Sequence, residues 1–398
     1  MFVRMGLHAR NRGFGGTELL PLILTLDYET FGSGVGDVMR DVIEPTRRLL
    51  SICDKHQAKM TIMFEVGEYW AFERYESQLR KDLGYSPWEQ MRGQAVDAVQ
   101  RGHDIQLHLH PQWIGATYNR GAWQLENRYW RLADLPGGLG GKDQITSITG
   151  ALHAGKQTLE CMIRPVKADY ECVCFRAGGF YAQPSRDVIA GMKEAGLRMD
   201  SSVVRGYRTD TPFPVDYSNV KTDKLVWWTT DTELVAEGRP GENILELAVS
   251  SRMEPYWNSF KWAKLRAAMR RRKTERASRA GKGSGSSNNI SSVPSCRTVL
   301  RKMLRKHAGT FDFCKLSRKD MLKRIREHAG HLDQPLVLIG HSKDFVNDRN
   351  FDKFLSNVHQ DATVQFMTMS EYTRTRVRDA TRAERGRPAP CDSQPAAG

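Results

Sequence analysis

The chain has 398 residues, 40% of them hydrophobic, so it can bury a sizeable core in one large domain or two ordinary ones. It has no run of about 18 or more apolar residues and no apolar stretch typical of a secretory signal at its start, so we expect a globular, cytoplasmic protein. The net charge of +14 comes from one segment, because residues 261–306 hold 15 Lys or Arg and one acid while the rest is neutral.

Strand-like and helix-like stretches alternate from residue 20 onward. Short apolar runs predict strands at residues 20–26, 59–66, 104–110, 173–177, 199–204, 243–250, 335–340 and 363–368. Helices are predicted between them at residues 37–56, 88–101, 146–163, 184–195 and 318–328. Strands that alternate with helices pair in parallel, and about seven or eight of them predict a distorted (β/α) barrel that is closed or nearly closed.

A basic segment rich in Gly and Ser interrupts this alternation. We predict an N-terminal extension at residues 1–19, the first part of the barrel at 20–254, the basic insertion with a helix at 255–330, the last barrel strands at 331–376 and a disordered tail at 377–398. The insertion lacks interleaved aromatic residues over 264–306 and any recognised nucleic-acid fold. This disfavours nucleic acid and favours an anionic membrane surface or an acidic polysaccharide as the partner of residues 261–306, with peripheral membrane association in the first case.

Reactive side chains follow the ends of several predicted strands. They are Asp27 and Glu29 after the first strand, Glu65 and Glu68 after the second, His108 and His110 at the end of the third, Arg176 at the end of the fourth, Asp200 at the start of the fifth and His341 after the seventh. In a barrel the carboxyl ends of the strands form the face that carries the active site. Acids, imidazoles and a guanidinium after so many strands therefore predict an active site at this face.

Spacing on the strands predicts which of these side chains share a side. Residues two apart on a strand point the same way, so Asp27 lies with Glu29, and His108 with His110. A carboxylate and two neutral imidazoles form a three-ligand site with open positions, as a catalytic Zn²⁺ or similar cation needs. The alternative is that the histidines cap the strand through hydrogen bonds to the backbone; the nearby acids favour the metal.

The motifs TLDYET (25–30), RGHDIQLHLHPQW (101–113), FRAGGFY (175–181) and LIGHSK (338–343) together resemble those of the polysaccharide deacetylase family (NodB-like, carbohydrate esterase 4). The resemblance covers most of residues 20–250 and resumes from 334 to about 375. It implies Asp27 as the catalytic base, Glu29 and His108 as metal ligands, Arg176 as the residue that holds the base, and His341 as the general acid.

One position departs from the family pattern. The family has a second histidine four residues after the first, whereas the residue four after His108 is Gln112. Either His110 supplies the missing ligand, which the strand periodicity favours, or the metal is bound weakly through Gln112 or not at all.

The function implied is the metal-dependent removal of N-acetyl or other acyl groups from amino sugars of a polysaccharide or its precursor, with a divalent metal, Zn, as cofactor. Gln112, Trp113, Phe180 and Tyr181 are the predicted substrate-binding residues, because aromatic rings near the motifs can stack on the apolar faces of sugars. Two alternatives stay open: an inactive carbohydrate-binding barrel, which Gln112 supports, and an amide hydrolase acting on a small non-sugar substrate.

Overall fold

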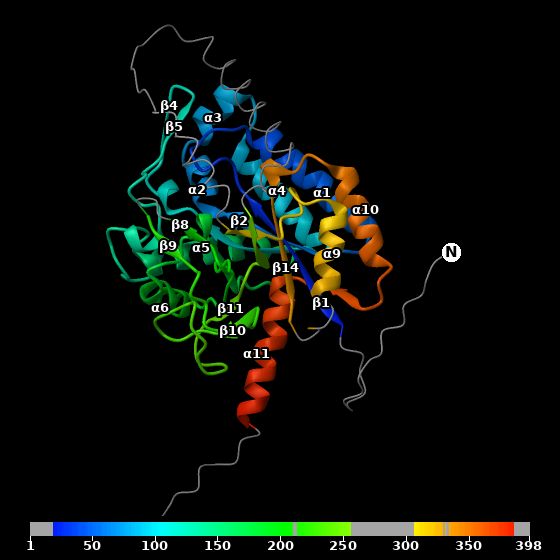
Figure 1. Ribbon diagram of the computed structural model, residues 1–398. Coiled ribbons are helices and arrows are strands. Elements are labelled where there is room, and N and C mark those ends of the chain that lie inside the picture. Colours follow the sequence, from blue (N-terminus) through cyan, green and yellow to red (C-terminus); the bar gives the residue numbers. More distant parts are fainter. Residues whose placement is uncertain (1–18, 210–212, 256–305, 329–330, 332–333, 386–398) are drawn as a thin grey trace, which may run out of the picture.

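The computed structural model describes residues 19–209, 213–255, 306–328, 331 and 334–385. The strands of its main sheet are β1 (Leu20–Tyr28), β2 (Met60–Glu65), β3 (Asp104–Leu109), β6 (Cys174–Ala177), β7 (Met199–Asp200), β10 (Val226–Trp228), β11 (Leu245–Leu247), β14 (Leu336–His341) and β15 (Val364–Phe366). Their order is β10-β11-β7-β6-β3-β2-β1-β14, with β15 also paired to β1 (Figure 1). Every pairing is parallel except that of β10 with β11.

Helices pack on the outer, convex face of this sheet. They are α1 (Glu44–Lys55), which follows a π-helical turn at Met39–Ile43, α4 (Pro87–Gln100), α5 (Ile148–Ile163), α6 (Ser185–Ala195), α9 (Arg318–His328) and α10 (Asp348–His359). Alternate residues of β1, among them Leu22 and Leu24, share one large core with Leu49 of α1 and Phe351 of α10. This follows from the alternation of side chains along a strand, which commits one set of β1 residues to the helices and the other to the concave face.

The concave face is filled at its lower end by the last helix, α11 (Met369–Arg385), which projects from the body in Figure 1. Ile23, Met63 and Val337 of the sheet form a second core there with Met369 and Tyr372 of α11. Hydrophobic burial thus occupies the amino ends of the strands, and polar side chains occupy their carboxyl ends.

The sheet is an open half-barrel, so the prediction of a closed or nearly closed barrel is corrected. On the side where a barrel would close, residues 311–313 replace a strand. The Phe311 N–H donates to Ser250 O at 2.7 Å, and the Ile339 N–H donates to Phe311 O at 3.0 Å. One isolated bridge, between Asp312 and Ile339, accompanies these contacts, and no continuous ladder forms there among the described residues.

Each of the eight predicted apolar runs contains a strand of the main sheet, and the five predicted helices are confirmed. The structure adds helices α2 (Val66–Arg74), α3 (Glu76–Leu83) and α10, and strand β10 of the main sheet. It also adds three hairpins: β4 (Thr117–Asn119) with β5 (Ala122–Gln124), β8 (Arg208–Thr209) with β9 (Val215–Asp216), and β12 (Ser251–Pro255) with β13 (Lys306–Thr310). The predicted disordered tail is wrong where α11 continues to Arg385, because Val377 and Ala380 on one face of that helix pack against the second core.

Most of the predicted basic insertion lies outside the described residues. The antiparallel pairing of β12 with β13 places Pro255 opposite Lys306. Helix α9, which was assigned to the insertion, belongs to the outer helical layer. Across the described ranges, no helix combines the length and apolar character that crossing a bilayer requires.

Candidate active site

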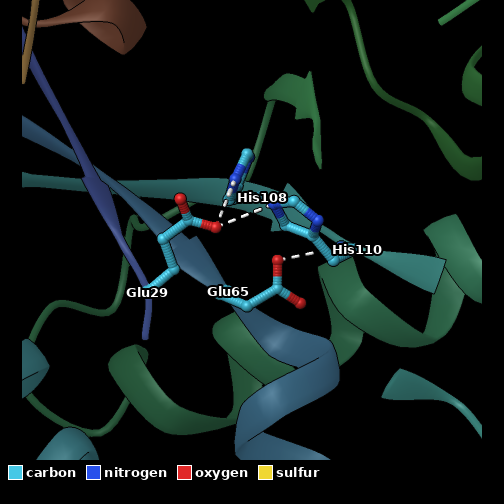
Figure 2. A group of neighbouring side chains, drawn as sticks. All are labelled: Glu29, Glu65, His108 and His110. Atoms are coloured by element: carbon cyan, nitrogen blue, oxygen red, sulfur yellow. Dashed lines mark hydrogen bonds and ion pairs between the residues drawn. The ribbon is translucent and has the colours of Figure 1, made fainter. Parts of the chain in front are cut away.

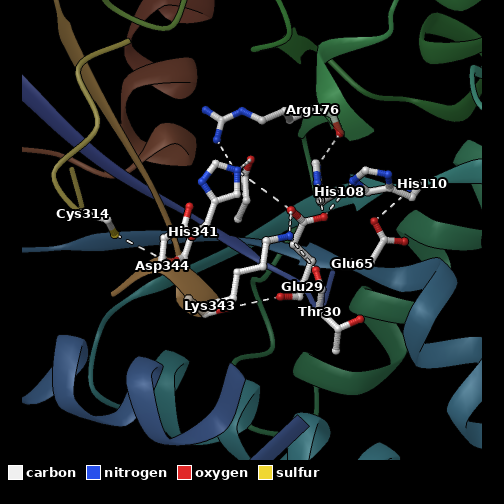
Figure 3. A network of polar contacts seen from close by, with 12 residues as sticks. Glu29, Thr30, Glu65, His108, His110, Arg176, Cys314, His341, Lys343 and Asp344 are labelled. Atoms are coloured by element: carbon white, nitrogen blue, oxygen red, sulfur yellow. Dashed lines mark hydrogen bonds and ion pairs between the residues drawn. The ribbon is translucent and has the colours of Figure 1, made fainter. Parts of the chain in front are cut away.

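Strand register aligns the reactive residues at one level of the concave face. Asp27 of β1 pairs in register with His341 of β14, and His108 of β3 pairs with both Glu65 of β2 and Arg176 of β6. Register partners on parallel strands point to the same face. Side chains from five strands therefore meet at the carboxyl ends, as the sequence predicts (Figure 3).

Four buried residues could hold a metal ion. Glu29, Glu65, His108 and His110 each offer one ligand atom, and these atoms lie within 4.8 Å of one another (Figure 2). Glu29 Oε2 is 2.7 Å from His110 Nε2 and 3.6 Å from His108 Nε2. Neither of these buried nitrogens forms a hydrogen bond of acceptable geometry within the described residues. A divalent cation between the carboxylate and the two nitrogens would bind all three donors, so this donor set fits a metal.

Glu65 is a member of this group that the sequence did not assign to the metal. Its Oε1 accepts the Gly67 N–H at 2.8 Å and its Oε2 accepts the His110 N–H at 2.9 Å, so it anchors the backbone of one candidate ligand. Burial raises its pKa above the usual range, although the two histidines lower it in part. Glu65 could have been identified from its place at the end of the second strand, because that strand lies between the strands that carry Glu29 and the two histidines.

Asp27 is held by a fully buried guanidinium. Arg176 Nη1 donates to Asp27 Oδ1 at 2.5 Å and to Thr25 Oγ1 at 3.1 Å, and its Nε donates to Ser201 O at 3.0 Å. Burial raises the pKa of Asp27, but the charge of Arg176 and those of nearby histidines outweigh it and leave the pKa below its usual value. The carboxylate is therefore ionised, with Oδ2 directed away from the arginine contact.

His341 faces Asp27 from the neighbouring strand. Its Nε2 lies 3.6 Å from Asp27 Oδ2 and 3.9 Å from Glu29 Oε1, and its side chain is 22% exposed. Burial lowers the pKa of His341, and the nearby carboxylates offset this only in part. The imidazole is the one member of this group of residues with clear access to solvent.

Lys343 is a site residue that the sequence did not single out. Its Nζ donates to Glu29 Oε1 at 2.8 Å and to Thr30 O at 2.6 Å. Burial raises the pKa of Glu29, but the Lys343 ammonium and then His110 bring it well below the usual range. The signal was the position of Lys343 two residues after His341, within LIGHSK.

Two of the predicted substrate-binding residues are buried. Gln112 is 0% and Trp113 is 1% exposed. Trp113 forms a small core with Ala71 and Ala116, so its ring offers no open face to a sugar. Gln112 contacts His110 instead of solvent, with its Nε2 3.2 Å from His110 Nδ1.

The other two predicted substrate-binding residues lie in the loop after β6. Phe180 has a left-handed backbone (φ 68°) and makes an edge contact with Tyr207. Tyr181 lies 6.1 Å from Trp130, measured between ring centroids. Trp130 also lines a hollow of about 580 Å³ with Gly32, Ser33, Trp123, Gln124, Leu125 and Asn127. Two of these residues, Gly32 and Ser33, belong to the loop that carries Glu29 out of β1.

No protein-family model and no curated protein matches the chain. Among solved structures, it is similar to a crystal structure of a candidate polysaccharide deacetylase from Mycobacterium smegmatis. The two chains are 13% identical with a TM-score of 0.42, over 98% of this chain and 99% of that one. The functional argument for this chain therefore rests on its side chains.

Proposed function

We propose that this protein is a metal-dependent hydrolase that removes N-acyl groups from amino sugars of a polysaccharide or its precursor. One observation carries the proposal: two buried imidazole nitrogens converge on one oxygen of the Glu29 carboxylate, beside the ionised Asp27. A site for binding alone needs no ionised carboxylate held next to an imidazole, whereas proton transfer does.

Glu29, His108 and His110 would hold the cation, with Glu65 within reach as a further oxygen donor. Nitrogen and oxygen donors of this kind suit Zn²⁺, and the proposed cofactor is Zn. When bound, such a cation supplies Lewis acidity at the acyl carbonyl and makes water a stronger acid.

Two residues of the chain, Asp27 and His341, carry out the proton transfers. Asp27 takes a proton from the attacking water on Oδ2, because Oδ1 is engaged by Arg176, which keeps the carboxylate ionised. The water oxygen forms the new bond to the acyl carbon, and the carbon–nitrogen bond breaks. His341 gives a proton to the departing amine, and its exposure lets it regain one from solvent. The products are a carboxylate and a free amino sugar.

The carbohydrate part of the proposal is supported by the hollow beside the β1 loop. Trp123 and Trp130 offer apolar ring surface there, and Ser33, Gln124 and Asn127 offer hydrogen bonds. Sugars present both an apolar face and hydroxyl groups, so this mixture suits them. A small non-sugar amide would leave much of this surface unused.

The cytoplasmic location and the anionic partner of residues 261–306 stay predictions. If this segment binds anionic lipid, co-sedimentation of the full chain with phosphatidylserine vesicles should fall steeply with salt, because exposed charges are screened. Binding that is insensitive to salt would count against it.

Variants of the two proton-transfer residues test the function. Asp27→Asn and His341→Ala should each lower acetate release from N-acetylglucosamine oligomers by roughly 10²–10⁴-fold while zinc content, measured by elemental analysis, is retained. His110→Ala should lose zinc. The exposed His359→Ala serves as the matched control and should keep both properties. Full activity in either of the first two variants, with folding checked by circular dichroism, would refute these assignments.

A further inference from the structure

Gln112 stands where the family pattern has a metal-binding histidine, but its side chain contacts the far side of the His110 ring. The amide lies against Nδ1, whereas Nε2 of the same ring faces Glu29. Gln112 Oε1 is buried and forms no hydrogen bond with any described residue.

An imidazole that binds a cation through one nitrogen carries its proton on the other, and that N–H needs an acceptor. His108 meets this requirement. Its Nδ1 is 2.9 Å from the carbonyl oxygen of Arg176, which can only accept, so Nδ1 carries a proton and Nε2, which faces Glu29, is the nitrogen left to bind a cation.

For His110 the equivalent acceptor comes from Gln112. A half-turn of the terminal amide exchanges Oε1 and Nε2, so Oε1 takes the place 3.2 Å from Nδ1 and accepts its proton. With the amide in the other orientation, Nδ1 accepts and Nε2 carries the proton toward Glu29, where it blocks a cation. On the basis of the proposed metal site, we infer that Gln112 is a positioning residue that directs the Nε2 lone pair of His110 to the metal and is not itself a ligand.

The other contacts of His110 hold the ring in place, so its hydrogen bond with Gln112 determines which ring nitrogen carries the proton. The backbone N–H of His110 is tied to Glu65 Oε2 at 2.9 Å. A Cβ on Gly178 would lie 2.4 Å from His110 Cγ and 2.5 Å from Nδ1, so the backbone of Gly178 lies against the ring. The carbonyl of Gln112 accepts the Glu126 N–H at 3.0 Å, which fixes the point from which its side chain extends. Since ring and backbone are held, the amide orientation is the remaining variable.

Calorimetric titration of zinc chloride into metal-stripped protein tests the inference. Gln112→Leu removes the acceptor at similar volume, and its zinc affinity should fall roughly 10–100-fold. Gln112→Glu restores an acceptor and should bind at least as tightly as wild type. Gln78→Leu, a change of the same kind at an exposed position of α3, should have no effect.

The outcomes separate this inference from the proposed function. If wild type and Gln112→Leu bind zinc equally, or if Gln112→Glu is as weak as Gln112→Leu, the positioning role is overturned while the metal site stands. If wild type binds no zinc, both fall. Nitrogen-15 NMR of the His110 ring in zinc-loaded wild type gives a test that needs no variant. A protonated Nδ1 is expected, and an unprotonated Nδ1 would overturn the inference.

Discussion

Arg176→Met is the most informative single change to the acid–base pair. Arg176 is 0% exposed, and the change removes its hydrogen bonds to Asp27, Thr25 and Ser201. Asp27 would then be a buried carboxylate without its partner, and breaking a buried ion pair in this way costs about 3–5 kcal/mol of unfolding free energy. Burial would also raise the pKa of Asp27, because the charge that now offsets it is gone.

Equilibrium unfolding in urea measures the loss, and Arg198→Met is the matched control. Arg198 pairs with Glu171 at 3.1 Å, but the two side chains are 48% and 40% exposed, so its loss should cost under about 1 kcal/mol. The double variant Arg176→Met with Asp27→Asn leaves no unpaired charge, so its destabilisation should be smaller than the sum of the single effects by about 1–3 kcal/mol. Additive effects, or a loss for Arg176→Met no larger than for Arg198→Met, would refute the reasoning.

Three further changes test other parts of the site and fold. Gly178→Ala would push a Cβ to 2.4 Å from the His110 ring, so calorimetry should show roughly tenfold weaker zinc binding or worse; unchanged affinity would contradict the close contact. Lys343→Met removes an ammonium 2.8 Å from Glu29, so zinc should raise Tm more than in wild type, because the metal then becomes the main counter-charge; a smaller rise would assign Lys343 to ligand orientation. Burial lowers the pKa of His103 from 6.5 to about 4, and the unfolded chain takes up its proton first as pH falls. Wild type should therefore lose about 3 kcal/mol of unfolding free energy between these pH values, and His103→Gln should lose less; parallel pH curves for the two proteins would argue against this.

The strands and the level of the site could be predicted from local sequence. Apolar runs of four to eight residues mark buried parallel strands, and polar residues at their ends fall on one edge whatever the exact closure of the sheet. Whether the sheet closes into a barrel could not be predicted in this way. It depends on a few backbone contacts of Phe311 with Ser250 and Ile339, residues that are far apart in the sequence.

Two features of the site also depend on long-range packing. Trp113 sits beside the His110 motif and has the chemistry of a sugar-stacking residue, but α2 and the turn after β3 enclose it in a core. From the sequence alone, Lys343 resembles an ordinary loop cation. The pairing of β14 with β1 is what brings its ammonium to Glu29. Neither placement follows from residue type or spacing alone, because each requires the neighbour supplied by another strand or helix.

The buried polar atoms of the site argue against the alternative of an inactive carbohydrate-binding barrel. Asp27, Glu65 and Lys343 all form hydrogen bonds, whereas His108 Nε2 and His110 Nε2 face only the shared Glu29 carboxylate, and Gln112 Oε1 has no hydrogen bond among the described residues. A buried, unsatisfied group such as Gln112 Oε1 costs about 1–3 kcal/mol, and burying two imidazoles beside a carboxylate adds a desolvation cost. A barrel that only bound sugar would gain stability by replacing them with apolar residues. A cation between Glu29 and the two imidazoles accounts for this arrangement, because it engages both Nε2 atoms and lets the Gln112 oxygen accept from Nδ1. The residue that first argued against a metal thus becomes part of the case for one.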